Sequence, residues 1–413
     1  MKIALYTLTS PLHDKVAVDA ASSAFISSIE NASGLVFDYR GPDFSDYGSH
    51  DLNLIYVRTG GTEGLFKEML YRIDGHVYIL TSGKSNSLAA SMEILSFLNQ
   101  EDRGGEIIHG SIEYIAGRIA MLAKVAEARR KLEGIRLGVI GEPSDWLISS
   151  KADRPSVADK LGVTLVDLPV ADLLAEYGNV SASDLGPIAS TIHERLSEAP
   201  SALQKYADGA FRIYKALKNI ITRHKLSGLT LRCFDLLDSI GNTGCLALAI
   251  LNAEGIPAGC EGDVPALISM VIGNALTGVS GFQANPSRID PETGEILFAH
   301  CTVPVNMVSR YTFDTHFESG IGIAISGEIP TGAATIFKIS GDLSRAICAE
   351  ANLLRCQSEN SLCRTQAVLK LHDSRLCSDY FLRRPVGNHH IIFPGSHKEA
   401  FHTFLSGLGT DIQ

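Results

Sequence analysis

The sequence is poor in features that would mark several classes of protein. Its 413 residues include eight cysteines, none in a Cys-x-x-Cys pair, which favours reduced thiols over a disulfide framework or a zinc knuckle. No apolar run approaches the roughly 18–20 residues that a membrane-spanning helix needs. The first ten residues hold a short apolar run interrupted by Tyr and Thr, which indicates a buried strand rather than a signal peptide. We therefore expect a cytoplasmic protein with no membrane partner.

Basic segments and nucleotide-binding loops are missing as well. The formal net charge is −10 and no Lys/Arg run is present, so a nucleic-acid backbone is disfavoured as a partner. The pattern Gly-x-x-x-x-Gly-Lys-Ser/Thr does not occur, which excludes a P-loop. No short repeat and no low-complexity linker interrupts the chain. At this length we expect two or three globular domains.

The first half of the chain alternates strand-like and helix-like segments. This pattern predicts two doubly wound, Rossmann-like α/β domains at residues 1–110 and 111–225. After about residue 225, alternating apolar segments separated by glycine turns predict a β-rich, barrel-like domain at residues 226–413. In open α/β domains ligands bind in the loops that follow the strands. Arg58 begins such a loop, although a plain turn is an equal alternative.

The single tryptophan, Trp146, lies in another loop of this kind. It follows Ser144 and Asp145 after an expected strand at residues 136–140. An exposed aromatic ring beside polar groups suits contact with a sugar. A packing role fits this residue equally well.

Two carboxylates precede an apolar helix expected from residue 264. Glu261 and Asp263 lie two residues apart, and in an extended segment such positions point the same way, so both can face one cavity. The carboxylates would then be stabilised by the N-terminal end of the helix dipole. The alternative is that Asp263 caps the helix and Glu261 is solvated.

Histidines follow at the ends of later expected strands. His300 ends one of them, and His389 and His390 begin another. Adjacent residues of a strand point to opposite faces, so at most one of the last two enters a shared site. Carboxylate and imidazole ligands together suit Mn²⁺, Mg²⁺, Co²⁺ or Zn²⁺.

These residues resemble the L-fucose isomerase/L-arabinose isomerase family. The matching stretches are Cys260-Glu261-Gly262-Asp263, Leu276-Thr277-Gly278, Phe298-Ala299-His300-Cys301 and Asn388-His389-His390. They cover roughly residues 229–413, and the first half of the chain matches in architecture only. The resemblance implies a metal-dependent aldose–ketose isomerase that binds Mn²⁺ or another divalent metal and moves a proton through an enediol. It also implies a homo-oligomer, a trimer or hexamer.

The resemblance carries roles to particular residues. Glu261 stands where the family has a glutamate that ligates the metal and transfers protons, and Asp263 is a second catalytic candidate. Asn285 and His389 stand at the other metal-ligand positions. Four residues are candidates for substrate binding: His300, His390, Trp146 and Arg58. His300 is also a candidate metal ligand, as in the arabinose branch, and His390 replaces His389 if the register shifts by one.

Asn285 departs from the family, which has a carboxylate at this position. An amide oxygen can touch a metal ion, but it carries no charge and cannot act as a base. Three outcomes follow: Asp263 supplies the missing charge, a single base serves an unusual sugar, or the metal site is degraded. The last outcome defines the alternative function, a non-catalytic sugar-binding protein built on the isomerase fold.

Overall fold

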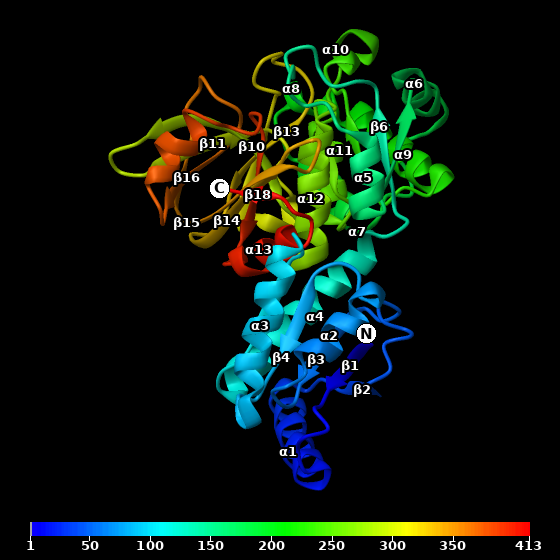
Figure 1. The fold of residues 1–413 in the computed structure, drawn as a ribbon. Helices are drawn as coiled ribbons and strands as arrows, with labels where there is room; N and C mark the ends of the chain where they lie inside the picture. Colours follow the sequence, from blue (N-terminus) through cyan, green and yellow to red (C-terminus); the bar gives the residue numbers. More distant parts are fainter. Residues whose placement is uncertain (1) are drawn as a thin grey trace. The chain divides into compact units, whose positions relative to one another are not determined.

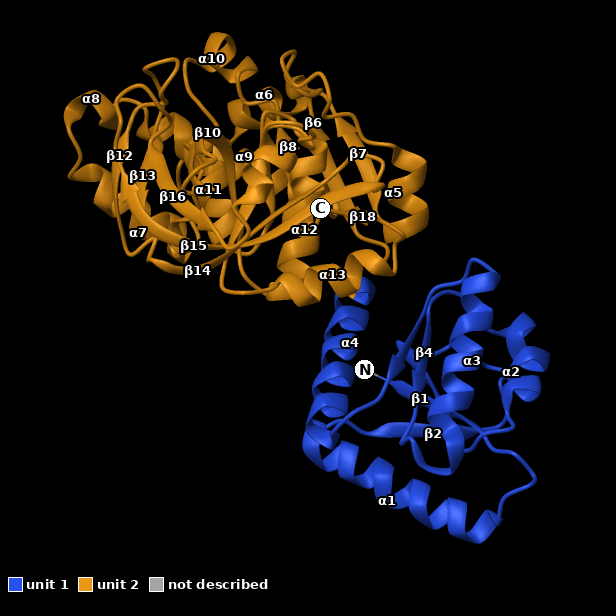
Figure 2. Cartoon of the chain, turned by 60° about the vertical axis from the view of Figure 1, so that its left-hand side comes forward, with its two compact units in different colours: residues 1–130 blue, residues 131–413 orange. Residues whose placement is uncertain are grey.

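The computed structural model describes residues 2–413, which divide by contacts into unit 1, residues 1–130, and unit 2, residues 131–413 (Figure 2). Unit 1 contains a five-stranded parallel sheet of order β2-β1-β3-β4-β5. Its strands are β1 (Ile3–Leu8), β2 (Phe37–Gly41), β3 (Leu52–Val57), β4 (Val77–Leu80) and β5 (Gly105–Ile108). Its helices are α1 (Lys15–Ser33), α2 (Glu63–Met69), α3 (Ser87–Gln100) and α4 (Ile112–Leu132), the last of which ends in unit 2.

Helices cover both faces of this sheet. One apolar cluster joins the sheet to α1 and α4, and a second joins it to α2 and α3 (Figure 2). β1 and β3 are almost entirely buried, as expected for central parallel strands covered on both faces. The prediction of a parallel α/β arrangement is confirmed for unit 1. Its finer description as Rossmann-like stays a prediction.

Unit 2 begins with a four-stranded parallel sheet of order β7-β6-β8-β9. The strands are β6 (Arg136–Ile140), β7 (Thr164–Leu168), β8 (Gly228–Leu231) and β9 (Ala258–Cys260). The helices between and after them are α5 (Arg154–Leu161), α6 (Val170–Asn179), α7 (Pro187–Ser197), α8 (Ser201–Gln204), α9 (Ala207–His224), α10 (Asp235–Ile240), α11 (Cys245–Ala253) and α12 (Val264–Thr277). The domain boundary expected after residue 225 falls between α9 and β8, inside this sheet.

A closed antiparallel barrel of six strands follows. In ring order they are β14 (Gly332–Ile339), β17 (His390–Pro394), β10 (Phe282–Asp290), β11 (Glu295–His300), β16 (Thr365–Leu371) and β15 (Arg345–Gln357), and β15 pairs back to β14. β18 (Asp411–Ile412) adds to β15, and the hairpin of β12 (Arg310–Asp314) and β13 (Ala324–Glu328) lies outside the ring. The chain ends with α13 (Lys398–Ser406) before β18. The β-rich, barrel-like prediction is confirmed.

Helix α12 joins the parallel sheet to the barrel (Figure 1). It packs against β8 and β9 on one side and against β14 and β17 on the other. Because both sides are covered, the helix is apolar almost all round and nearly all of its residues are buried. A core cluster that contains no residue of α12 also joins the two, because it runs from the sheet through α9 and α11 into the barrel. This packing brings the ends of β9, β11 and β17 together.

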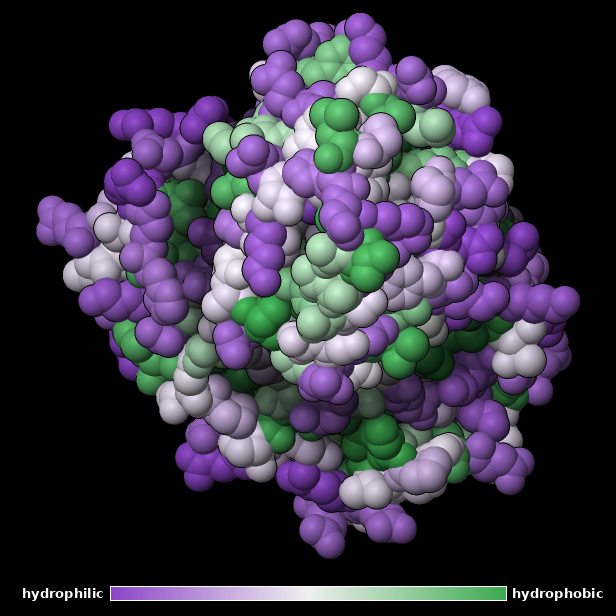
Figure 3. Space-filling view, turned by 60° about the horizontal axis from the view of Figure 1, so that its bottom comes forward, coloured by the Kyte–Doolittle hydropathy of each residue, from purple (hydrophilic) through white to green (hydrophobic). Residues whose placement is uncertain are grey.

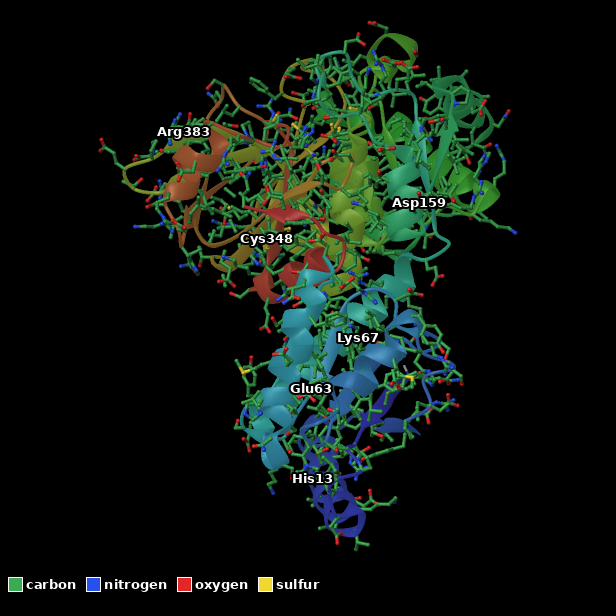
Figure 4. The ribbon with its side chains drawn as sticks, viewed as in Figure 1. His13, Glu63, Lys67, Asp159, Cys348 and Arg383 are labelled. Atoms are coloured by element: carbon green, nitrogen blue, oxygen red, sulfur yellow. The ribbon has the colours of Figure 1, made fainter. Side chains whose placement is uncertain are left out.

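The surface and the thiols agree with the composition. Polar and apolar residues are interspersed over the face shown in Figure 3. Among residues 2–413, no helix combines the length and apolarity needed to cross a bilayer. All eight cysteines are free thiols. Cys348, labelled in Figure 4 on barrel strand β15, is buried, and burial raises its pKa to about 12.

Candidate metal centre

Glu261 follows directly after β9, at the carboxyl edge of the parallel sheet in unit 2. Its backbone is left-handed, with φ of 63°, and Gly262 continues the turn with φ of 70°. A Cβ on Gly262 would lie 2.5 Å from the carbonyl oxygen of Glu142, so only glycine fits there. The turn buries the Glu261 side chain, which is 11% exposed. The alternative of a solvated Glu261 is therefore wrong.

Two imidazoles face one oxygen of this carboxylate. Oε1 of Glu261 lies 3.5 Å from Nε2 of His389 and 3.8 Å from Nε2 of His300. The two rings meet edge to face, with centroids 5.3 Å apart. His300 is the last residue of β11, and its Nδ1 is hydrogen-bonded to Thr302 Oγ1 at 2.9 Å. That bond turns Nε2 of His300 toward Glu261.

The charges of the three groups are coupled. Burial alone raises the pKa of the Glu261 carboxyl, but the attraction of the neighbouring His300 and His389 rings outweighs burial and holds this pKa well below its usual range. Burial lowers the pKa of His300. His389 is buried too, yet the carboxylates of Asp263 and Glu261 raise its pKa to about 9. A carboxylate next to two imidazoles is an O/N ligand set that suits a divalent metal.

The residues present fit a metal ion. One ligand atom each from Glu261, His300 and His389 lie within 4.8 Å of one another. Nε2 of His389 is buried and has no hydrogen-bond partner. Oδ1 of Asn285 is also buried without a partner. Buried polar atoms are normally satisfied, so unpaired nitrogen and oxygen atoms at this place fit a site that binds a metal ion.

Asn285 lies on β10 beside the strand of His300. It pairs with Ala299 on β11, the residue before His300. Gln283, two positions earlier on β10, has a structural role. Its Oε1 accepts a hydrogen bond from the Cys260 amide at 2.8 Å and so links β9 to the barrel. Asn285 as a metal ligand stays a prediction, which its unpaired Oδ1 supports.

Asp263 lies on the other side of His389. Its Oδ2 is 2.9 Å from Nδ1 of His389, and its Oδ1 accepts a hydrogen bond from the Ala266 amide at 2.8 Å, which caps α12. The capping alternative is thus confirmed. The expectation of an extended segment with both carboxylates facing one cavity is wrong, because the left-handed turn at Glu261 sends the two side chains to opposite nitrogens of one imidazole.

Asp263 also contacts a lysine that the sequence had not suggested. The ammonium of Lys338, on β14, lies 3.4 Å from both carboxylate oxygens, and the two side chains are 1% and 0% exposed. Burial opposes ionisation of Asp263, but Lys338 and His389 lower its pKa to about 2. A lone lysine in the apolar run at residues 333–340 is the sequence signal that could have identified it.

Trp146 binds the carboxylate directly. Its indole Nε1–H donates to Oε2 of Glu261 at 2.7 Å, although the residue is 53% exposed overall. Its ring packs edge-on against Phe234, whose own ring meets His316 edge-on. Trp146 therefore both packs and contacts the candidate centre. Sequence reasoning had given no role to Phe234 or His316.

His390 points away from the centre, as expected for the neighbour of His389 on a strand. Its Nε2 is 2.9 Å from the Tyr380 hydroxyl and its Nδ1 is 2.9 Å from the Asn388 carbonyl oxygen. Burial lowers its pKa to about 3. Both ring nitrogens are engaged within the chain, so the structure gives His390 a packing role and no free group for a substrate.

Arg58 belongs to unit 1. Its Nε donates to Ser22 Oγ at 2.8 Å, and its Nη2 pairs with Asp19. It lines a cavity of about 710 Å³ at the ends of β1 and β3. The loop prediction is consistent with this cavity, and the role of Arg58 in substrate binding stays a prediction.

The fold and the centre define a class: a parallel α/β sheet joined to a closed barrel, with a buried Glu-His-His group between them. No family model matches the chain. It is similar to the sulfoquinovose isomerases of Clostridium sp. (strain MSTE9), at 24% identity over 55% of this chain and 52% of that protein, and of Alkalicoccus urumqiensis, at 22% over 54% and 51%. It is also similar to the sulfoquinovose isomerase of Priestia aryabhattai, at 24% identity over 62% of this chain and 59% of that protein.

The chain thus spans about half the length of the curated relatives it matches. All three are isomerases by name. The similarity supports an isomerase and hence an enzyme.

Proposed function

We propose that this chain is a metal-dependent aldose–ketose isomerase acting on a monosaccharide, as the resemblance to fucose and arabinose isomerases implies. The observation that carries the proposal is the buried Glu261-His300-His389 group, with Nε2 of His389 unpaired. Similarity to proteins named for isomerisation of a sugar supports the same reaction class. A homo-oligomer in the cytoplasm belongs to the proposal as well.

The metal ligands in this proposal are Glu261, His300 and His389, with the amide oxygen of Asn285 as a fourth. The chemistry that a bound Mn²⁺ or similar ion supplies there is Lewis-acid polarisation of the sugar's carbonyl and neighbouring hydroxyl oxygens. His300 and His389 hold their Nε2 atoms toward that position, because their Nδ1 atoms are engaged by Thr302 and Asp263.

Glu261 carries the proton between C1 and C2 of the sugar. Its carboxylate is ionised at neutral pH and so has lone pairs that can accept a proton from carbon. The Trp146 indole fixes Oε2, which retains a second lone pair for that proton. Asp263 is ill placed as a base, since its oxygens already face Ala266, Lys338 and His389. Asn285 cannot titrate, so a single base serves the carbon-to-carbon transfer.

Proton exchange at C2 in D₂O with added Mn²⁺ tests the proposal. The sugars to be screened are sulfoquinovose, because the relatives are named for it, and L-fucose and L-arabinose. We expect deuterium incorporation with at least one sugar, loss of the signal after chelation, and recovery on adding metal. Stoichiometric metal binding with no exchange on any sugar would support the sugar-binding alternative, and failure to retain a divalent metal would refute the proposed centre.

A further inference from the structure

Lys338 is an ionisable residue placed where the barrel alone would call for an apolar one. On β14 the residues that share its side of the strand, Ala334 and Ile336, belong to the main apolar core. The Lys338 side chain is 1% exposed. Burying an ammonium group costs several kcal/mol unless it is paired. The burial of the Lys338 ammonium group therefore indicates that its charge has a specific role.

The partner of Lys338 explains where the charge acts. Its ammonium lies 3.4 Å from both oxygens of Asp263, and that carboxylate is 2.9 Å from Nδ1 of His389. All three side chains are 0% or 1% exposed. They form a line that runs from the barrel wall to the imidazole. On the far side of that imidazole, Nε2 lies 3.5 Å from Glu261 Oε1.

A small cavity lies against the same lysine. It measures about 180 Å³ and is lined by Ser150, Lys338, Arg345 and Gly387, among others, and by no carboxylate. A cavity of this size that serine and arginine side chains line has room for water. It gives the ammonium hydrogens that do not point to Asp263 access to water. Burial lowers the pKa of Lys338, and the Asp263 carboxylate opposes that shift.

The consequence is a fixed orientation for His389. An ionised carboxylate only accepts hydrogen bonds, so Nδ1 of His389 carries a hydrogen, and in the neutral ring that a metal ligand requires Nε2 presents its lone pair. Asp263 is held at both oxygens: the Ala266 amide at the start of α12 fixes Oδ1, and Lys338 contacts both. Hydrogen bonds of this kind to a ligating histidine set its tautomer and its basicity.

We propose that Lys338 is a positioning residue for the metal centre, which acts through Asp263 to hold His389 with Nε2 free toward Glu261 and His300. The inference rests on the proposed metal site for its effect on affinity. Lys338 touches neither the sugar nor the metal, so it is not a catalytic residue.

The test compares Lys338→Met with Lys370→Met, which places the same substitution at an exposed lysine on barrel strand β16. Mn²⁺ titration calorimetry should show a roughly 10- to 100-fold weaker affinity for Lys338→Met alone.

Turnover separates positioning from simple structural support. With Mn²⁺ saturating, kcat of Lys338→Met should return to within a few-fold of the wild type, because the ligands themselves are intact. If Lys338→Met does not fold, Lys338→Gln replaces it under the same criteria, since it also removes the ammonium charge but keeps a polar end group. Lys338→Arg, which keeps the charge, should restore the wild-type Mn²⁺ affinity.

The inference is overturned if the folded variant keeps wild-type Mn²⁺ affinity. A lower melting temperature with unchanged Mn²⁺ affinity would likewise reduce Lys338 to a structural residue. If the wild type binds no divalent metal, the proposed function fails and this inference fails with it, whereas equal Mn²⁺ affinity of the wild type and Lys338→Met overturns the inference alone.

Discussion

Nδ1 of His389 lies 2.9 Å from Oδ2 of Asp263, on the opposite edge of the ring from Glu261. One imidazole thus separates two carboxylates that are only two residues apart in the chain. The carboxylate of Glu261 faces the candidate metal position, and that of Asp263 supports the ring from behind. Changes at the two carboxylates should therefore have different effects.

Glu261→Gln should abolish isomerisation and leave the fold intact. The amide loses the negative charge of the ligand set and cannot take a proton from carbon. We expect C2 exchange to fall by at least about 1,000-fold, since a general base and a charged ligand are removed together. Circular dichroism and the melting temperature should stay near wild type. Near-normal turnover would mean that another residue is the base.

Trp146→Phe should weaken catalysis with little effect on stability. The phenyl ring can keep the contact with Phe234, but the 2.7 Å hydrogen bond to Glu261 Oε2 is lost. Hydrogen bonds to charged groups contribute about 1.5–3 kcal/mol, so we expect roughly a 10- to 100-fold loss in kcat/KM. Urea midpoints should match within error, because the residue is half exposed. An unchanged kcat/KM would show that Trp146 only packs.

Asn285→Asp should tighten metal binding if its side chain is a ligand. The substitution restores the carboxylate that the related family has and adds a negative charge next to the unpaired Oδ1 position. Calorimetry with Mn²⁺ should show at least about tenfold tighter binding, in line with the preference of hard cations for charged oxygen ligands. Ser287→Asp, an exposed position on the same strand, is the control. Equal affinity of Asn285→Asp and wild type would place Asn285 outside the ligand set.

The fold was largely predictable because its elements are regular and apolar. The strand predicted at residues 136–140 agrees with β6, and the helix predicted from residue 264 is α12. β15 was missed, because polar residues and a bulge between Leu353 and Arg355 break its pattern.

The candidate site was predictable in its members and not in its geometry. Residue types and the family resemblance pointed to Glu261, His300 and His389. A positive φ at a residue other than glycine is uncommon, so nothing in the sequence indicated the left-handed turn at Glu261. Lys338 reaches Asp263 across 75 residues of sequence through barrel closure. Such a contact depends on tertiary packing and has no local pattern.

His316 should make stability depend on pH between about 6.5 and 4. Burial lowers its pKa to about 4, and His300 and Arg364 act in the same direction while Glu261 opposes them. The ring contacts Phe234, its Nδ1 is hydrogen-bonded to Ser319, and Glu318 is 3.9 Å from Nε2. In the unfolded chain the imidazole takes up a proton near pH 6.5.

The sign of the effect follows from linkage. Because the unfolded state binds this proton first, the folded state loses stability as pH falls from 6.5 to 4, with no further loss from His316 below that. The full effect is on the order of 2–3 kcal/mol. Urea unfolding of wild type and His316→Gln at pH 7.5, 6, 5 and 4 isolates it. The difference in unfolding free energy should change steadily in favour of the variant, and a constant difference would contradict the lowered pKa.

Gly273→Ala should destabilise unit 2, although alanine is the better helix former. Gly273 lies in α12, and a Cβ there would come 1.9 Å from the Phe393 ring carbon Cζ on barrel strand β17. Overpacking of this kind costs about 1–3 kcal/mol, which exceeds the roughly 1 kcal/mol of stability that the better helix propensity of alanine contributes.

Gly117→Ala in α4 is the matched control, because its Cβ would meet nothing within 4 Å. The control should gain up to about 1 kcal/mol. Because Asp263 caps α12, weaker Mn²⁺ binding should accompany the lower urea midpoint of Gly273→Ala. Equal urea midpoints for the two variants would show that α12 and the barrel can move apart without a loss of stability.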